Sequence, residues 1–229
     1  DHTYIKERDK KVTMYFGKIE SKLKYSYSGK LKLIQLMPFY SMRFKNGFQL
    51  TYGYAIVPFE EYKGIEFNNY GLNFINLRYS PSEKINILSR VIIGSDIAYN
   101  IEEPVIGNRA SFLFSLNYQP TDKFNTGIMI SSESMNYKVT NDEIYNGYIL
   151  RTDSNYQFNR DLSLKLVLEY NDFSNHLFFQ TLLKWNPNPS TIFYLGGNTD
   201  MKNNINSNAN WVSNSAQLFF KLQYLFKVQ

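Results

Sequence analysis

The sequence predicts an all-β fold, an antiparallel transmembrane β-barrel of about twelve strands. Apolar and polar side chains alternate with a period of two in about a dozen segments, and this is the period of a strand with one apolar face. The chain holds 19 tyrosines and 18 phenylalanines, yet its mean hydropathy is only −0.39. No apolar run approaches the roughly 20 residues that a membrane helix needs. A closed barrel is the other structure that satisfies its backbone hydrogen bonds in lipid.

The clearest alternation lies in the last segment, 215–226. Its even positions are apolar or aromatic: Ala216, Leu218, Phe220, Leu222, Tyr224 and Phe226. The odd positions include Gln217, Lys221 and Gln223, with Phe219 and Leu225 as exceptions. We expect the even positions to face lipid and the polar odd positions to face the lumen.

The other strands follow from the same alternation and from turn residues between the segments. With the last segment included, the predicted strands are about 18–27, 31–44, 48–56, 69–79, 85–99, 109–118, 123–138, 145–158, 164–170, 177–185, 190–199 and 215–226. The parity breaks at Leu33-Ile34, which predicts a bulge, and again at Phe74-Ile75. Segment 190–199 shows no parity that can be assigned. Asn46-Gly47 is a strong hairpin signal because this dipeptide tolerates positive φ.

The predicted connections alternate in length. Short turns are expected at 45–47, 80–84, 119–123, 159–161 and 186–190, and longer loops at 57–68, 100–108, 139–144 and 200–213. Outer-membrane barrels have short periplasmic turns and longer extracellular loops, so the short set is expected in the periplasm. The predicted division of the chain is a periplasmic lead-in over 1–10 and a barrel over 11–229. The chain opens at Asp1, and we expect it to be a processed or truncated piece.

A water-soluble sandwich or lipocalin-type barrel would show the same alternation, with the apolar parity inside. Three features favour the membrane. The polar parity is sparse in charge for a water-facing wall of this size, and the strands are long for a globular domain. Aromatic residues also gather at strand ends, where lipid-facing girdles place them. These aromatic residues are Tyr79, Tyr99, Tyr118, Tyr156, Phe158, Tyr170, Trp185 and Phe226.

Five strand-and-turn motifs between about residues 57 and 226 carry a family resemblance. They are Val57-Pro58-Phe59-Glu60-Glu61-Tyr62-Lys63-Gly64, Leu77-Arg78-Tyr79-Ser80-Pro81-Ser82, Asn155-Tyr156-Gln157-Phe158-Asn159-Arg160-Asp161-Leu162-Ser163-Leu164, Trp185-Asn186-Pro187-Asn188-Pro189-Ser190-Thr191 and Leu218-Phe219-Phe220-Lys221-Leu222-Gln223-Tyr224-Leu225-Phe226. Together they resemble a family of Bacteroidota outer-membrane proteins. These proteins carry a periplasmic carbohydrate-binding-family-9-like module followed by a C-terminal β-barrel domain of unknown function.

The resemblance implies an outer-membrane location and further sequence upstream of this chain. The motifs specify a type of barrel far better than an activity. Some members of the family are labelled hydrolases, but no catalytic motif is visible in this sequence. The N-terminal module is absent from the chain, so its sugar-binding role does not carry over.

Few residues offer catalytic or metal-binding chemistry. His2 and His176 are the only histidines, and Ser174-Asn175-His176 cannot form a catalytic geometry within one loop. The pairs Glu60-Glu61 and Glu102-Glu103 are expected in solvated loops, because adjacent carboxylates in an extended chain point apart. There are no cysteines. The sequence therefore predicts no catalytic residues, no metal site and no cofactor.

The inward parity carries most of the charge. The candidate lumen-lining residues are Lys22, Lys24, Arg43, Arg78, Arg90, Asp96, Arg109, Arg151, Asp153, Lys165, Glu169, Lys184 and Lys221. One interpretation is a network of salt bridges across the lumen that stiffens the barrel, and the other is a cation-lined path that selects anions. The net charge of +5 is consistent with residual lysines and arginines in the lumen and turns, or with an anionic solute or lipopolysaccharide.

The leading prediction for function is a non-enzymatic outer-membrane protein that acts as a narrow, porin-like channel or as a membrane-anchored component of a larger assembly. An outer-membrane hydrolase and a pure scaffold, binding a partner through its loops or wall, are the alternatives. Outer-membrane lipid is the expected partner, and other outer-membrane or periplasmic proteins are further candidates. Nucleic acid is not expected as a partner, because the basic residues form no run.

Overall fold

The computed structural model describes residues 2–6, 11–204 and 210–226, and within them the side chains of 11–203 and 211–226. The strands are β1 (His2–Lys6), β2 (Val12–Tyr25), β3 (Leu31–Phe44), β4 (Phe48–Tyr62), β5 (Ile65–Ser82), β6 (Ile85–Ile97), β7 (Ile106–Thr121), β8 (Phe124–Tyr137), β9 (Glu143–Gln157), β10 (Leu162–Asn171), β11 (His176–Asn188), β12 (Thr191–Asn204) and β13 (Asn210–Tyr224). Within these ranges, no helix has the length and apolar character to cross a membrane.

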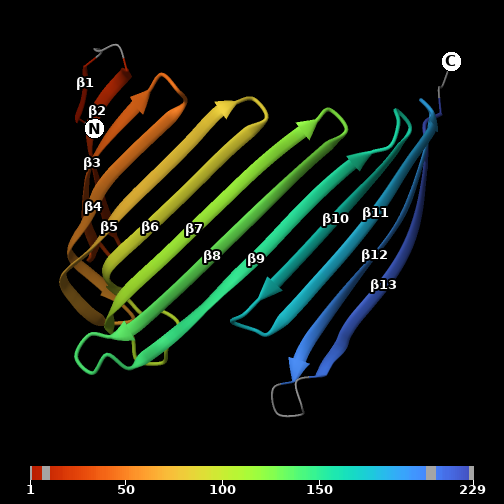
Figure 1. Cartoon of the computed structure of the whole chain (residues 1–229). Coiled ribbons are helices and arrows are strands. Elements are labelled where there is room, and N and C mark those ends of the chain that lie inside the picture. Colours follow the sequence, from red (N-terminus) through yellow and green to blue (C-terminus); the bar gives the residue numbers. More distant parts are fainter. Residues whose placement is uncertain (1, 7–10, 205–209, 227–229) are drawn as a thin grey trace. The chain divides into compact units, whose positions relative to one another are not determined.

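The strands form one sheet in which each strand hydrogen-bonds to its neighbours in sequence, in the order β1 to β13 (Figure 1). Every pair whose register is known is antiparallel, as between β4 and β5. The predicted all-β antiparallel fold is confirmed. The sheet has 13 strands, against about twelve expected, because β1 lies inside the predicted lead-in and pairs with residues 15–19 of β2.

The chain divides into two compact units that are described separately. Unit 1 comprises Asp1–Phe114 and Ser131–Asn146, and unit 2 comprises Ser115–Ile130 and Gly147–Gln229. Several strands contribute one part to each unit, so the division follows contacts in space rather than order along the chain.

The short connections fall where the turn residues predicted them. β3 and β4 are joined through Lys45–Gly47, β5 and β6 through 83–84, β7 and β8 through 122–123, and β11 and β12 through 189–190. Gly47 has a φ of 82°, a positive value that glycine adopts readily, and this is why Asn-Gly predicts a hairpin turn here. The 98–105 connection is longer, and its ends are joined by a hydrogen bond from Ala98 N–H to the Val105 carbonyl, 2.9 Å.

The predicted loop at 57–68 is wrong. β4 continues to Tyr62 and β5 begins at Ile65, so the connection is the two-residue turn Lys63–Gly64, with φ values of 51° and 84°. Glu60 and Glu61 make this segment resemble a solvated loop in the sequence, whereas their side chains bind partners within the fold. The loop predicted at 200–213 is also mostly strand, and its central part lies outside the described residues.

Two faces alternate along the strands, and β4 shows them clearly. Tyr52, Tyr54 and Ile56 are exposed, while Gly53, Ala55 and Val57 between them are buried. The exposed fraction of Tyr52 is 52%. Large apolar side chains therefore lie on the more exposed face of unit 1, the reverse of what a water-soluble sheet shows.

The last strand, β13, has the predicted alternation. Leu218, Phe220 and Leu222 pair with Gly197, Leu195 and Phe193 of β12, on one face of the sheet. Lys221 pairs with Tyr194 on the other face. Both faces of β13 are exposed because it is the last strand of the sheet, so the neighbouring strand is the better guide: the exposed fraction of Leu195 is 49%, while Gly196 beside it is buried. This face of unit 2 is also apolar and exposed.

The two parity breaks have different causes. The register between β3 and β4 shifts between Ile34 and Leu36, so the predicted bulge near Leu33-Ile34 is confirmed. At Phe74-Ile75 the register stays regular, with Phe74 opposite Gly53 and Ile75 opposite Tyr52. The parity breaks there because Phe74 is an aromatic residue on the less exposed face.

Unit 1 contains a small cluster of buried apolar side chains. Its buried members are Leu33, Val57, Phe67, Tyr70 and Ile97. Tyr62 and Ile106 pack against it. The cluster lies where β4 and β5 approach their shared turn, close to the start of the 98–105 connection. It fixes this end of the unit and holds the polar side chains described next.

Candidate functional site

Side chains directly opposite each other on paired strands share one face of a sheet. In unit 1, Arg43 is opposite Gln49, Gln49 is opposite Arg78, and Arg90 is opposite Asn76. We call the face that carries these three arginines the charged face of unit 1. Glu20 is opposite Met37 on this face. Lys22 and Lys24 share the face because they lie two and four residues further along the same strand.

The corresponding face of unit 2 carries Arg151 and Glu169, which are opposite each other, and Lys184, which is opposite Tyr194. Tyr194 is in turn opposite Lys221. Asp153 and Lys165 lie on the same face by alternation. We call it the charged face of unit 2. Every candidate lumen-lining residue thus lies on a strand, and its role in a lumen stays a prediction.

Two pairs of candidates are in direct contact. The Arg109 guanidinium donates to Asp96 Oδ2 at 2.6 Å, and that of Arg151 donates to Glu169 Oε2 at 2.6 Å. Both pairs join neighbouring strands. The remaining candidates form no ion pair within 4 Å in the described part of the chain.

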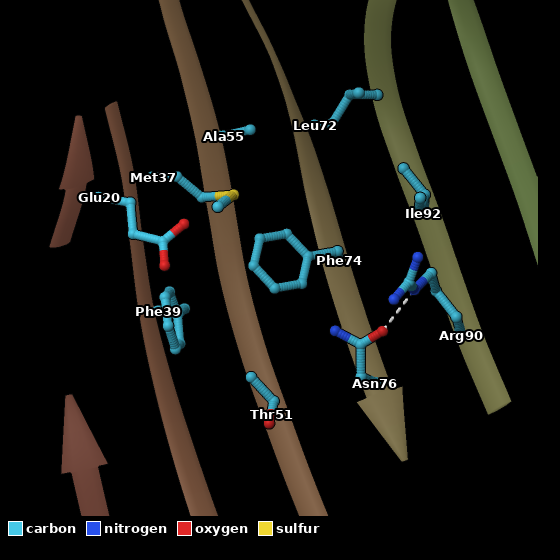
Figure 2. Close-up of a pocket in the computed structure, with 10 residues that line it drawn as sticks. All are labelled: Glu20, Met37, Phe39, Thr51, Ala55, Leu72, Phe74, Asn76, Arg90 and Ile92. Atoms are coloured by element: carbon cyan, nitrogen blue, oxygen red, sulfur yellow. Dashed lines mark hydrogen bonds between the residues drawn. The ribbon is translucent and has the colours of Figure 1, made fainter. Parts of the chain in front are cut away.

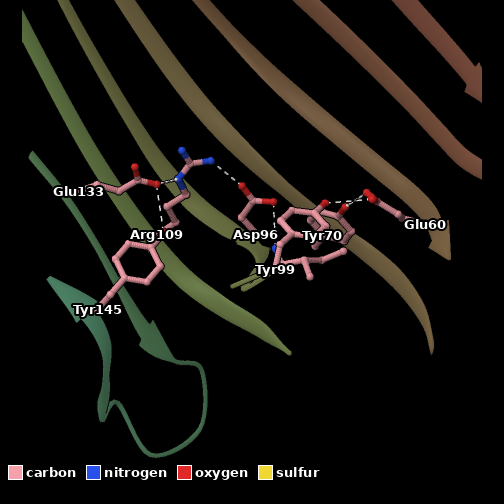
Figure 3. Close-up of polar contacts among 8 residues, drawn as sticks. Glu60, Tyr70, Asp96, Tyr99, Arg109, Glu133 and Tyr145 are labelled. Carbon is pink, nitrogen blue, oxygen red and sulfur yellow. Dashed lines mark hydrogen bonds and ion pairs between the residues drawn. The ribbon is translucent and has the colours of Figure 1, made fainter. Parts of the chain in front are cut away.

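The pair formed by Arg109 and Asp96 extends into a larger network in unit 1 (Figure 3). The Arg109 Nε atom lies 2.7 Å from Glu133 Oε1, without the alignment of a hydrogen bond. The Tyr145 hydroxyl donates to the same Glu133 oxygen at 3.0 Å. The network joins β6 to β9, and it neutralises a half-buried arginine that would otherwise be costly to hold. The sequence analysis missed Glu133 and Tyr145.

Glu60 and Glu61 have separate sets of partners, which replaces the interpretation of a solvated loop. Glu60 accepts hydrogen bonds from the hydroxyls of Tyr70 at 2.5 Å and Tyr99 at 2.9 Å. Burial, reinforced by this hydrogen bond, raises the pKa of the Tyr99 phenol, which keeps it a donor.

The Glu61 side chain is only 4% exposed and forms ion pairs with Lys32 at 2.5 Å and Lys30 at 3.1 Å. Its other oxygen accepts the Gly64 N–H at 3.1 Å, which closes the Lys63–Gly64 turn. Two lysines and a backbone donor leave Glu61 no free oxygen. Among the described residues, no three histidine or acidic side chains converge as a metal site would require.

The sequence analysis also missed a contact of His176. Its Nδ1 atom lies 3.0 and 3.1 Å from the two carboxylate oxygens of Asp200, which also accepts from Asn214 Nδ2 at 3.1 Å. A carboxylate holds the histidine in a similar way in catalytic triads. The nucleophile is missing, because no serine, threonine or lysine within the described ranges hydrogen-bonds to His176.

A cavity of about 460 Å³ lies on the charged face of unit 1 (Figure 2). Its lining comes from β2 to β6: Glu20, Met37, Phe39, Thr51, Ala55, Leu72, Phe74, Asn76, Arg90 and Ile92. Most of the wall is apolar. Arg90 enters at one border, where its Nε donates to Asn76 Oδ1 at 2.6 Å. Glu20 is held by Lys18, whose Nζ donates to it at 2.8 Å.

No protein-family model and no curated protein sequence matches the chain. Among solved structures, it is similar to a Pseudomonas aeruginosa FadL homologue, at 8% identity and a TM-score of 0.35 over 96% of this chain and 75% of that one. It is similar to the NanC porin, at 12% identity and a TM-score of 0.36 over 94% and 99%. It is also similar to the P. putida toluene transporter TodX, at 9% identity and a TM-score of 0.31 over 86% and 74%. Likeness at this level assigns the chain to no family.

Proposed function

We propose that the chain is a non-enzymatic β-barrel of the bacterial outer membrane, acting as a narrow channel or as the membrane-anchored component of a larger assembly. One observation carries this proposal. In each unit, the more exposed face of the strands is apolar and the opposite face holds the charges, as Tyr52 and Leu195 show on one side and Arg90 and Lys184 on the other.

Lipid explains this arrangement better than water does. Exposed apolar surface costs about 25 cal/mol per Å² in water, and soluble monomers rarely carry patches beyond a few hundred Å². Strands of 13 to 18 residues, such as β6 and β5, exceed the roughly 9–11 residues that cross a bilayer at a tilt. In lipid the backbone of every strand must be paired, so closure of the sheet is part of the proposal.

The charged faces favour an anion-selective path. In the described part of unit 1, Arg43, Arg78 and Arg90 have no carboxylate within 4 Å, whereas Arg109 has two. Unpaired guanidinium groups in a confined, weakly screened space give a positive potential that attracts anions and repels cations. The paired charges stiffen the wall. The salt-bridge interpretation of the lumen therefore applies to the paired residues, and the interpretation as an anion path applies to the unpaired arginines.

Conductance in planar lipid bilayers tests the channel. The whole chain, folded in detergent and inserted, should give discrete steps, and the reversal potential in a KCl gradient should favour chloride. Arg90→Glu should reduce that preference by removing an unpaired cation, and Arg151→Glu should do so by breaking its ion pair and leaving two carboxylates without a cation. Arg160→Gln in the turn after β9 should not change it. Selectivity for cations in the unmutated protein would refute the anion path, and absence of conductance would favour the assembly component.

The resemblance to Bacteroidota barrels supports a finer assignment. On that basis the chain is the barrel part of a longer outer-membrane protein that has a periplasmic module, and its partners include that module or neighbouring proteins. Mass spectrometry of the native protein from outer membranes tests this, because peptides upstream of Asp1 should be present.

An outer-membrane hydrolase is the second candidate, and the contact between His176 and Asp200 is the observation that favours it. We rank it below the channel because the described residues offer His176 no nucleophile.

A further inference from the structure

The cavity on the charged face of unit 1 has the chemistry of a binding site for a small amphipathic anion. Five neighbouring strands contribute to its wall, and the apolar contributions come from Met37, Phe39, Leu72, Phe74 and Ile92. Its volume of about 460 Å³ lies within the ~300–1,000 Å³ common for small-molecule sites. Such sites combine an apolar wall with a few placed polar groups, as here.

Gly53 makes the aromatic part of the wall possible. It lies between Phe39 and Phe74 in register, and a Cβ atom added to it would come 2.3 Å from the Phe74 ring and 2.6 Å from Phe39 Cβ. Any larger residue would push the Phe74 ring away. Figure 2 shows this ring between β4 and β5, facing into the cavity. The position thus brings two aromatic side chains together on the face that also carries Arg43, Arg78 and Arg90.

Arg90 supplies the charge of the site. Only its Nε is engaged, by Asn76, and in the described part of the chain no carboxylate lies within 4 Å of the guanidinium. The terminal nitrogens keep four N–H donors in the fork that matches a carboxylate. Asn76 holds this fork at the border of the cavity, with Thr51 beside it in register.

Glu20 is the acidic group of the lining, and Lys18 neutralises it through the 2.8 Å contact. Glu20 also lies on β2, whereas Arg90 lies on β6, so the carboxylate and the guanidinium are separated by three intervening strands. The cavity therefore presents one positive end, an aromatic and aliphatic middle, and a neutralised far side.

We propose that this cavity binds an aromatic monocarboxylate, with its carboxylate on Arg90 and its ring against Phe39 and Phe74. The proposal depends on the proposed function in one respect, that the charged face of unit 1 is open to water. The carboxylate receives charge-assisted hydrogen bonds, and the ring is transferred from water to an apolar wall. A neutral aromatic loses the first interaction, and a short carboxylate such as acetate loses the second.

Isothermal titration of the whole chain, folded in detergent, tests the site with 2-naphthoate as probe. We expect saturable binding with one site per chain, and binding of the neutral 2-naphthamide and of acetate at least about tenfold weaker. Arg90→Gln should weaken naphthoate binding by about 10- to 100-fold, the range for a lost hydrogen bond to a charged group. Arg160→Gln is the matched control and should leave binding unchanged.

Two glycine substitutions distinguish an effect on the aromatic wall from a general effect on folding. Gly53→Ala should weaken naphthoate binding by about tenfold or more, while Gly17→Ala should not, because a Cβ at Gly17 meets nothing closer than 3.9 Å. If Gly53→Ala does not fold, as judged by heat-modifiable gel migration, Phe74→Leu replaces it with the same expectation. Equal binding of naphthoate and naphthamide, or no effect of Arg90→Gln, would overturn the proposal.

Failure of the naphthoate site can be distinguished from failure of the proposed channel. Arg151→Glu lies in unit 2 and should alter ion selectivity without altering naphthoate affinity. Conductance without naphthoate binding would refute the site alone. Naphthoate binding that depends on Arg90, in a chain without conductance, would support the site and count against the channel.

Discussion

Arg151 on β9 and Glu169 on β10 are directly opposite each other in the sheet, and their side chains form an ion pair of 2.6 Å. The pair couples two adjacent strands of unit 2 on the charged face. Both side chains keep partial access to solvent, so screening limits the energy they contribute.

We expect a double-mutant cycle on this pair to give a coupling of only about 0.2–1 kcal/mol, the range for solvent-accessible ion pairs. The variants are Arg151→Gln, Glu169→Gln and the double change, with unfolding followed in urea from detergent or lipid. A coupling of about 3 kcal/mol or more would show that this face is dry, contrary to a water-filled lumen.

The last strand, β13, offers a test of which face meets lipid. Leu222→Arg should destabilise the inserted protein by about 2–4 kcal/mol if the residue lies near the bilayer midplane. Lys221→Ala, one residue away on the opposite face, should cost far less. Folding into lipid vesicles, titrated with urea, measures both. Equal sensitivity at the two positions would contradict the membrane assignment.

The ends of the strands can be assigned to sides of the membrane by labelling, because the chain has no cysteine of its own. Glu102→Cys lies in the 98–105 connection, and Glu83→Cys lies in the turn at the other end of β6. On intact cells, a membrane-impermeant maleimide should modify the first and spare the second until lysis. The reverse pattern would invert the topology.

No hydrolytic activity is expected, although His176 contacts Asp200. His176→Ala and Asp200→Asn should leave the hydrolysis of fluorogenic esters and phospholipids at the level of a blank, as in the unmutated protein. Activity in the unmutated protein that both substitutions abolish, and that Ser174→Ala retains, would identify the pair as part of an active site.

Strand alternation and turn chemistry predict much of this fold from sequence. The last strand, the bulge near Leu33 and the hairpin at Asn46-Gly47 all follow from patterns that lie within one strand or one turn. Those signals act within a single strand or turn, so they need no knowledge of which strands pair.

The failures occur where pairing decides the outcome. From the sequence alone, Glu61 is expected in a loop. Its partners Lys30 and Lys32 lie about 30 residues earlier in the chain, and strand pairing brings them beside it. The contact between His176 and Asp200 likewise depends on β11 pairing with β12. In β12, the neighbouring Gly196 and Gly197 remove side chains from both faces, which is why its parity could not be assigned.

The candidate site was predicted in part. Arg90 and its face follow from alternation, but the cavity depends on Gly53 lying under Phe74 across two strands. Phe74 counted as an irregularity in the sequence pattern. Its register shows that it is a regular member of the charged face, and its apolar character there is the signal that could have indicated a binding wall.

The alternation along β13 also limits how this protein can change in length. A single inserted or deleted residue within the strand would move Leu222 and its neighbours to the opposite face, and Lys221 to the apolar one. Every position beyond the change would be reversed until the chain reached a connection. Gains and losses of single residues should therefore accumulate in the segment 98–105, and inside the strands only changes of two residues, or bulges such as the one in β3, should be tolerated.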